Sequence, residues 1–185
     1  MIHLLARLLP GRPRAIDENS SWRRIVYASV GGLYEVGFAS DESALLAVSE
    51  SGRGLFSLAT GELIARDDAP VGPNSEWFDT DQRIALGIGS LTGTWIPMVG
   101  LEGGQLNRSH GEWRVELRGA GRDESALLFH ARTGDKWLVE RHFSTVRSYG
   151  FSPSGRFLVL ATGSTLTVLS NTDRTAPSLM RNTPT

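Results

Sequence analysis

The sequence predicts an all-β protein built from about four short antiparallel meander units. Residues 41–46 read Asp-Glu-Ser-Ala-Leu-Leu, and the same six letters return at 123–128, 82 positions later. Half of that spacing is the period expected of a stacked or radially arranged supersecondary unit. The chain also contains 21 glycines and no long segment with the 3.6-residue periodicity of an amphipathic helix,. A repeated β unit therefore organises the fold.

An aromatic residue just ahead of a polar turn marks the start of a unit. Phe38 precedes Ala-Ser-Asp, Phe78 precedes Asp-Thr-Asp 40 positions later, and Phe151 precedes Ser-Pro-Ser at an offset of 113. These matches place the unit starts near residues 36, 76, 117 and 149. Since each unit must bury its first strand against a neighbour, we expect Phe38, Phe78 and Phe151 to lie in the core.

Short apolar runs separated by glycine-containing turns recur within the units, as expected of β-meanders. The first unit has runs at 44–48, 55–58 and 62–65, the second at 84–88, the third at 113–117, 126–130 and 136–140, and the last at 157–161 and 165–169. Residues 22–30 are expected to supply a further strand ahead of the first unit.

One segment of the last unit carries a family resemblance. Residues 150–161, Gly-Phe-Ser-Pro-Ser-Gly-Arg-Phe-Leu-Val-Leu-Ala, resemble the blades of WD40-like and related β-propellers, in which a Phe-Ser-Pro-x-Gly turn joins the first two strands. The resemblance covers 34–66 and 146–170, but the Trp-Asp and Gly-His pairs of regular WD40 blades are absent from the sequence. It implies a small four-bladed or open β-propeller, at the low end of the usual range of roughly four to eight blades. A twisted β-sandwich is the alternative.

The length of 185 residues fits one ordinary domain,. We divide the chain into an N-terminal arm at 1–20, an all-β repeat domain at 21–170, and a polar C-terminal tail at 171–185 that we expect to be flexible,. The apolar run in the arm is too short to span a bilayer and has no small-residue cleavage site. The chain has no cysteine, which is compatible with a reducing compartment, and we expect a cytoplasmic protein,.

Motifs of catalysis and metal binding do not occur in the sequence. The four histidines lack metal-ligand spacing, and neither a phosphate-binding loop nor a nucleophile elbow is present,. With a pI of about 6.4 and arginines interleaved with acids, nucleic acid is not an expected partner,. We therefore assign no catalytic residue, no metal ligand and no cofactor, and we expect no membrane partner.

Charge is unevenly distributed along the chain, although its net charge is −1. Residues 41–110 sum to −6 and residues 111–185 to +3. Five acids and no base lie between positions 67 and 82, together with a tryptophan. Complementary charge speeds the encounter with a partner, and a buried aromatic side chain can anchor it. The predicted partner-binding residues are Asp67, Asp68, Glu76, Trp77, Asp79 and Asp81. In the alternative interpretation, this segment is a solvated loop whose aromatic residues belong to the core.

These observations favour a non-catalytic protein-binding module. In size, lack of catalytic motifs and irregular blade repeats, the chain is similar to the small immunity proteins encoded beside bacterial contact-dependent inhibition toxins. Such proteins share a role and no sequence motif, so no residue is assigned from this resemblance. It implies direct binding to a cognate toxin, with a basic toxin domain as the expected partner. The alternatives are a propeller-like scaffold subunit of a larger assembly and an enzyme with a site at the propeller mouth.

Overall fold

The computed structural model describes residues 12–18, 20–72, 75–119 and 124–172. Most of the predicted arm and tail, and Asp123 of the second hexapeptide copy, lie outside these residues. Within them the strands form four sheets, which we number 1 to 4 in the order of the predicted units. Among the described residues the single helical element is the 3-10 helix η1 (Gly89–Leu91). The all-β class and the four meander units are thus confirmed.

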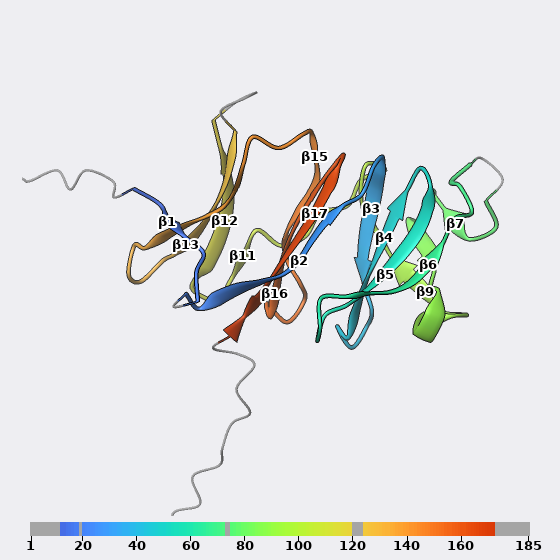
Figure 1. Cartoon of the computed structure of the whole chain (residues 1–185), viewed down its shortest axis with the longest axis horizontal. Coiled ribbons are helices and arrows are strands. Elements are labelled where there is room, and N and C mark those ends of the chain that lie inside the picture. The colour runs from blue at the N-terminus through green and yellow to red at the C-terminus, as the bar shows by residue number, and fades with distance from the viewer. Residues whose placement is uncertain (1–11, 19, 73–74, 120–123, 173–185) are drawn as a thin grey trace, which may run out of the picture.

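The sheets lie side by side along the long axis of the molecule, in the spatial order 3-4-1-2 (Figure 1). Sheets 3 and 2 therefore occupy its two opposite ends (Figure 1). The arrangement is propeller-like in that sheets pack face against face, but the row is open.

Sheet 1 has the strand order β10-β3-β4-β5-β6 and is built from the first unit. Its strands are β3 (Leu33–Phe38), β4 (Ala44–Ser49), β5 (Gly52–Ser57), β6 (Leu63–Asp67) and β10 (Val99–Gly100). The turn between β4 and β5 requires glycine at position 52, because φ there is +121°,. A Cβ atom at this position would also lie 2.0 Å from the carbonyl oxygen of Asp67.

Sheet 4 combines the last unit with the strand expected near the N-terminus. Its order is β15-β16-β17-β2, with β15 (Val146–Phe151), β16 (Phe157–Thr162), β17 (Thr165–Asn171) and β2 (Trp22–Ser29). The pairing of β2 with β17 is antiparallel and runs from Trp22↔Asn171 to Ser29↔Thr165. The chain then passes directly into β3, so the last unit lies next to the first.

Sheets 2 and 3 complete the row. Sheet 2 consists of β7 (Phe78–Asp79), β8 (Ile84–Leu86) and β9 (Trp95–Pro97). Sheet 3 has the order β1-β14-β13-β12-β11, with β1 (Arg14–Ala15), β11 (Ser109–His110), β12 (Trp113–Arg118), β13 (Ser125–His130) and β14 (Lys136–Arg141). Strand β1 comes from the predicted arm and pairs in parallel with β14.

Each junction between neighbouring sheets has its own apolar core. A single strand contributes to two of these cores, because its successive side chains point to opposite faces of the sheet. In β4, Leu45 packs toward sheet 4 while Leu46 packs toward sheet 2. In β16, Val159 packs toward sheet 1 while Leu160 packs toward sheet 3. Both strands are buried at every position, because successive side chains point to opposite faces and each face is covered,.

Arginine side chains cross the junctions and bond to backbone carbonyl groups of the next sheet. Arg147 of sheet 4 donates to the Leu33 oxygen of sheet 1 at 3.1 Å, and Arg24 donates to the Val139 oxygen of sheet 3 at 2.8 Å. Arg53 does the same between sheets 1 and 2. Hydrogen bonds from charged donors are stronger than neutral ones, so these contacts fix the positions of the sheets.

The predicted repeat alignment is confirmed by the strand register. Phe38, Phe78 and Phe151 each end or begin a first strand and pair across to residues seven positions later: Leu45, Ala85 and Leu158. Phe78 and Phe151 are buried in the core as expected, and Phe151 lies 5.7 Å from the ring of Trp22. Phe38 differs, because it is only partly buried against the core between sheets 1 and 4.

A buried carboxylate joins the turn of the first unit to that of the last. Glu42 is 5% exposed and accepts hydrogen bonds from the hydroxyl of Ser152 (3.0 Å) and from the backbone N–H of Ser154 (2.7 Å). The Ser154 hydroxyl and the Arg156 guanidinium also contact it. Burial alone would raise the pKa of Glu42, but the hydrogen bonds from Ser154 and Ser152 outweigh it and hold the pKa below its ordinary value,.

Replacing Phe151 with alanine should lower the free energy of unfolding by about 3–5 kcal/mol, the range for a buried aromatic side chain. Phe38→Ala is the matched variant and should cost less, because its ring is only partly buried. Urea denaturation measures both. A loss below about 1 kcal/mol at Phe151 would contradict the assignment of this residue to the core between sheets 3 and 4.

Glu42→Gln should lower the free energy of unfolding at pH 7 by about 1–3 kcal/mol, because buried donors lose a charged acceptor. A carboxyl group with a lowered folded-state pKa stabilises the fold above its ordinary value of 4.5, and this stabilisation is lost as the pH falls through the folded-state pKa,. Urea titrations at pH 7 and pH 3 should therefore show the difference from wild type shrinking in acid. Glu62→Gln, at an exposed position, is the control and should leave the free energy of unfolding unchanged at both pH values.

Candidate functional site

The six residues predicted to bind a partner fall into two groups in the structure. Asp67 and Trp77 contact Arg53, and Asp68 forms an exposed ion pair with Arg66 at 2.5 Å. The other three, Glu76, Asp79 and Asp81, lie on or beside sheet 2, at one end of the molecule. Asp67, Trp77 and Asp79 are half-buried, whereas Asp68, Glu76 and Asp81 are exposed.

Arg53 neutralises one of the predicted acids. Its Nε atom donates to Oδ2 of Asp67 at 3.0 Å, its guanidinium carbon lies 4.3 Å from the centre of the Trp77 ring, and a further N–H reaches the Leu86 oxygen. The hydrogen bond from Arg53 holds the pKa of Asp67 below its ordinary range. With only 9% of the Arg53 side chain exposed, this group holds sheet 1 against sheet 2. Asp67 and Trp77 thus contribute to the junction.

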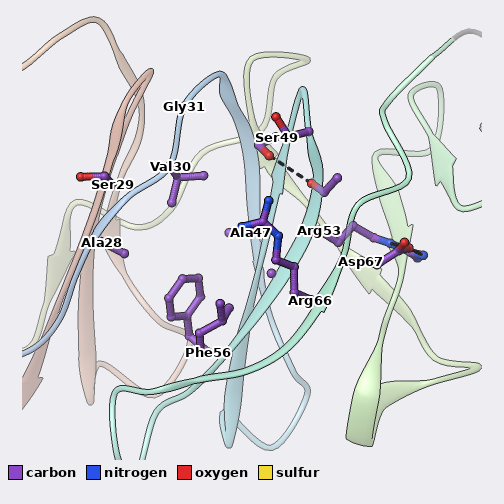
Figure 2. A pocket seen from close by; sticks show the side chains of 14 residues that line it. Ala28, Ser29, Val30, Gly31, Ala47, Ser49, Arg53, Phe56, Arg66 and Asp67 are labelled. Atoms are coloured by element: carbon purple, nitrogen blue, oxygen red, sulfur yellow. Dashed lines mark hydrogen bonds and ion pairs between the residues drawn. The ribbon is translucent and has the colours of Figure 1, made fainter.

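A groove of about 280 Å³ lies between β2 of sheet 4 and strands β4 to β6 of sheet 1 (Figure 2). Its walls include the small residues Ala28 and Ala47 and the ring of Phe56, with Arg53 and Asp67 at one end (Figure 2). Small-molecule sites usually measure about 300–1,000 Å³ and bury most of their ligand. The volume of this groove lies just below that range.

The outer face of sheet 2 is an apolar surface beside acidic side chains. Phe78, Ala85 and Ile96 point into the core shared with sheet 1, so the alternate residues point away from it,. We call this the sheet 2 outer face; it consists of Asp79, Ile84, Leu86, Trp95 and Pro97. Trp95 is 45% exposed. This is a high value, because tryptophan side chains are on average largely buried.

The acids around the sheet 2 outer face are available to solvent to different extents. Asp79 is half-buried and accepts hydrogen bonds from the backbone N–H and the side-chain amide of Gln82, both at 2.8 Å. Glu76 and Asp81 are exposed. Glu76 and Asp81 therefore carry charge to the solvent, while Asp79 also shapes the turn after β7.

At the opposite end of the molecule, sheet 3 presents a basic outer face. Val115, Leu128 and Val139 point into the core shared with sheet 4. The alternate residues form what we call the sheet 3 outer face: Arg114, Glu116, Arg118, Ser125, Leu127, Phe129, Lys136, Leu138 and Arg141. Phe129 is at its centre, with the charged groups of Arg114, Arg118 and Lys136 at 5.2, 5.9 and 5.8 Å from its ring. Glu116 bridges the two arginines.

Sheet 3 also carries His130, whose ring nitrogens are both occupied. Nε2 lies 3.3 Å from a Glu112 carboxylate oxygen, and Nδ1 lies 3.2 Å from the Thr133 hydroxyl. The imidazole packs edge-on against Trp113 at 4.6 Å. These contacts give His130 a structural role. Across the described ranges, no group of three or more acids and histidines is placed to hold a metal ion.

Glu35 of β3 is a second buried acid, with a different environment from Glu42. It is 1% exposed, and its Oε1 atom accepts a hydrogen bond from the backbone N–H of Glu102 at 2.7 Å. Its Oε2 atom has no hydrogen-bond partner in the part of the chain that the structure describes. Burial raises the pKa of Glu35 to about 7,.

No protein-family model and no curated protein matches this sequence. Among solved structures, a TolB-like protein from Agrobacterium tumefaciens is similar, at 13% identity and a TM-score of 0.28. The match covers 78% of this chain but 60% of that protein's length. A similarity at this level carries no functional argument, and the fold described above rests on the strand pairing of this chain itself. In the described residues, no helix is long and apolar enough to cross a membrane.

The pKa of Glu35 predicts a pH-dependent stability. Because its folded-state pKa is about 7 and its ordinary value 4.5, its contribution is fully present below about pH 4.5 and is lost as the pH rises through 7,. Glu35→Gln should remove this dependence, so the difference in unfolding free energy between variant and wild type should grow with pH over that window. Urea titrations at pH 5, 6, 7 and 8 measure it. The exposed Glu50→Gln should follow wild type, and parallel curves for Glu35→Gln and wild type would contradict the assignment.

Proposed function

We propose that this chain is a non-catalytic protein-binding module that recognises a basic partner through the sheet 2 outer face. The observation that carries the proposal is Trp95, which is 45% exposed on the outer face of an end sheet. Aromatic side chains surrounded by a polar rim are the residues on which binding energy concentrates. Ile84 and Leu86 extend the apolar area around it.

The charges beside this face define the kind of partner. Glu76 and Asp81 are exposed and Asp79 lies on the face itself, whereas Arg83 is the one base of the same segment. Residues 76–83 thus hold three acids and one base, a net charge of −2, which attracts a positively charged surface. Asp68, also exposed, adds to the acidic character of the preceding loop although it is paired with Arg66. Exposed acids of this kind raise the association rate by long-range attraction and contribute less to the lifetime of the complex.

In its more specific form, the proposal is that the partner is a toxin domain and the chain is its cytoplasmic immunity protein. An immunity protein of this kind acts by occupying its partner's surface, and therefore needs a docking face and no catalytic group. The acidic face with its exposed tryptophan supplies such a surface for a basic toxin domain. The products of the reading frames that flank the gene are the partners to test.

A scaffold subunit is the second candidate, and a separate observation favours it. The sheet 3 outer face points away from the core between sheets 3 and 4 and lies at the other end of the row of sheets (Figure 1). A subunit that links two neighbours needs two such faces pointing in different directions.

Two sets of substitutions test the proposal against purified candidate partners in surface-binding kinetics. Asp68→Lys, Glu76→Lys and Asp81→Lys together should reduce the association rate about ten-fold or more at low salt, because steering is lost. Trp95→Ala should weaken binding by about 2 kcal/mol or more, mostly through faster dissociation. Both should leave the urea midpoint nearly unchanged, since these side chains are exposed.

Matched controls exist elsewhere on the chain. Glu18→Lys, Glu50→Lys and Glu62→Lys change the net charge by the same amount away from sheet 2, and Tyr27→Ala removes an aromatic that is 59% exposed on β2. Equal losses in the control set and in the sheet 2 set would count against the proposed face. Asp67→Lys and Trp77→Ala should instead lower stability, because both residues contact Arg53.

A further inference from the structure

We propose that a second copy of this chain is a partner of the sheet 2 outer face, docking on it head to tail through its sheet 3 outer face. This inference rests on the proposed function, because it takes the sheet 2 outer face as a docking surface and names an occupant. The proposed function requires a partner with a basic surface, and the sheet 3 outer face of this chain is basic.

The first argument is continuity of packing. Every junction inside the molecule is a face-to-face contact between neighbouring sheets with an apolar core: 3 with 4, 4 with 1, and 1 with 2. Sheet 3 follows sheet 2 in the chain, yet these two lie at opposite ends of the row (Figure 1). Sheets 2 and 3 of one copy therefore do not pack on each other, whereas sheet 3 of a second copy continues the row after sheet 2 of the first.

The second argument is the match of charge and apolar area. On the sheet 3 outer face, Arg114, Arg118 and Lys136 surround Phe129, and Glu116 is the one acid among them. The sheet 2 outer face carries Trp95 with Asp79, and the exposed acids Glu76 and Asp81 lie in the loops that flank β7. Each face thus has an exposed or half-exposed aromatic ring and a charge opposite to that of the other.

The same charges disfavour the symmetric pairings. Two sheet 3 outer faces would oppose arginines and a lysine to one another, and two sheet 2 outer faces would oppose acids, each at a cost in binding free energy. The favoured contact joins two different surfaces, so it is heterologous. Such contacts give a closed ring if the rotation between copies closes, and an open chain of molecules if it does not.

A mixing experiment with the full chain tests the inference in sedimentation velocity. The sheet 3 variant carries the neutralising substitutions Arg114→Gln and Lys136→Gln, so that it gains no attraction to the other altered face, and the sheet 2 variant carries Glu76→Lys, Asp81→Lys and Trp95→Ala. Wild type should show a mass that rises with concentration and falls again at 1 M salt, because exposed charges are then screened. Each variant alone should associate at least ten-fold more weakly, since one of its two faces is altered. Circular dichroism and urea midpoints establish that both variants are folded.

The equimolar mixture of the two variants gives the decisive result. One unaltered sheet 2 outer face and one unaltered sheet 3 outer face remain between them, so the mixture should form a 1:1 dimer and nothing larger. A chain that carries all five substitutions should not associate with either variant. Wild type that stays monomeric at every concentration would overturn the inference. So would association that persists in both single-face variants, or a mixture that fails to form the dimer.

Failure of this inference is distinguishable from failure of the proposed function. The sheet 3 variant keeps the sheet 2 outer face intact, so it should bind a foreign basic partner as well as wild type does even when it no longer self-associates. Loss of self-association with retained partner binding in this variant shows that the two activities separate. A monomeric wild type that still binds such a partner through Trp95 would reject the second copy as occupant and retain the docking face.

Discussion

The pairing of β2 with β17 determines where every other part of the molecule lies. It attaches a strand from the start of the domain to the last unit, over seven registered residue pairs from Trp22↔Asn171 to Thr165↔Ser29. Because β3 follows β2 after a short turn, the first unit must then pack beside the fourth. Units two and three are left at the two ends, each with one face turned away from the row. The open row, the acidic end and the basic end all follow from this one non-local contact.

Local structure was predictable from the sequence because it depends on neighbouring residues. Turn glycines, apolar runs and the offsets of 40 and 113 fixed the strands and their register, which the pairs Phe38↔Leu45 and Phe151↔Leu158 confirm. The spatial order of the sheets was not predictable. It depends on which strand pairs with β2, and no local sequence pattern identifies that strand. Glu42 shows the same limit: both copies of the hexapeptide are identical in sequence, and the role of Glu42 depends on Ser152 and Ser154 of another unit.

Only part of the candidate site could be predicted from the sequence. The composition of the sequence located an acidic segment. It did not show that the charge of Asp67 is neutralised by Arg53. Pairing β5 with β6 as a hairpin would have shown it, because the register places these two residues directly opposite each other. Trp95 was missed because unit two has diverged and its strands are short. The signal available there was the alternation of Trp95 and Pro97 around the buried Ile96. Assigning alternate residues of these strands to opposite faces of the sheet would have placed Trp95 on the same face as Ile84 and Leu86.

The small size of sheet 2 has a consequence for the motions of the molecule. Its three strands comprise two, three and three residues, and it shares a single core with the rest of the chain, whereas sheets 1 and 4 are covered on both faces. Opening this sheet exposes less apolar surface than opening either central sheet, so amide hydrogens should exchange through a sub-global event that spares the centre. Anything bound to its outer face would suppress that event by mass action. The end that we propose as the docking surface is thus also the end whose local opening a bound partner would suppress.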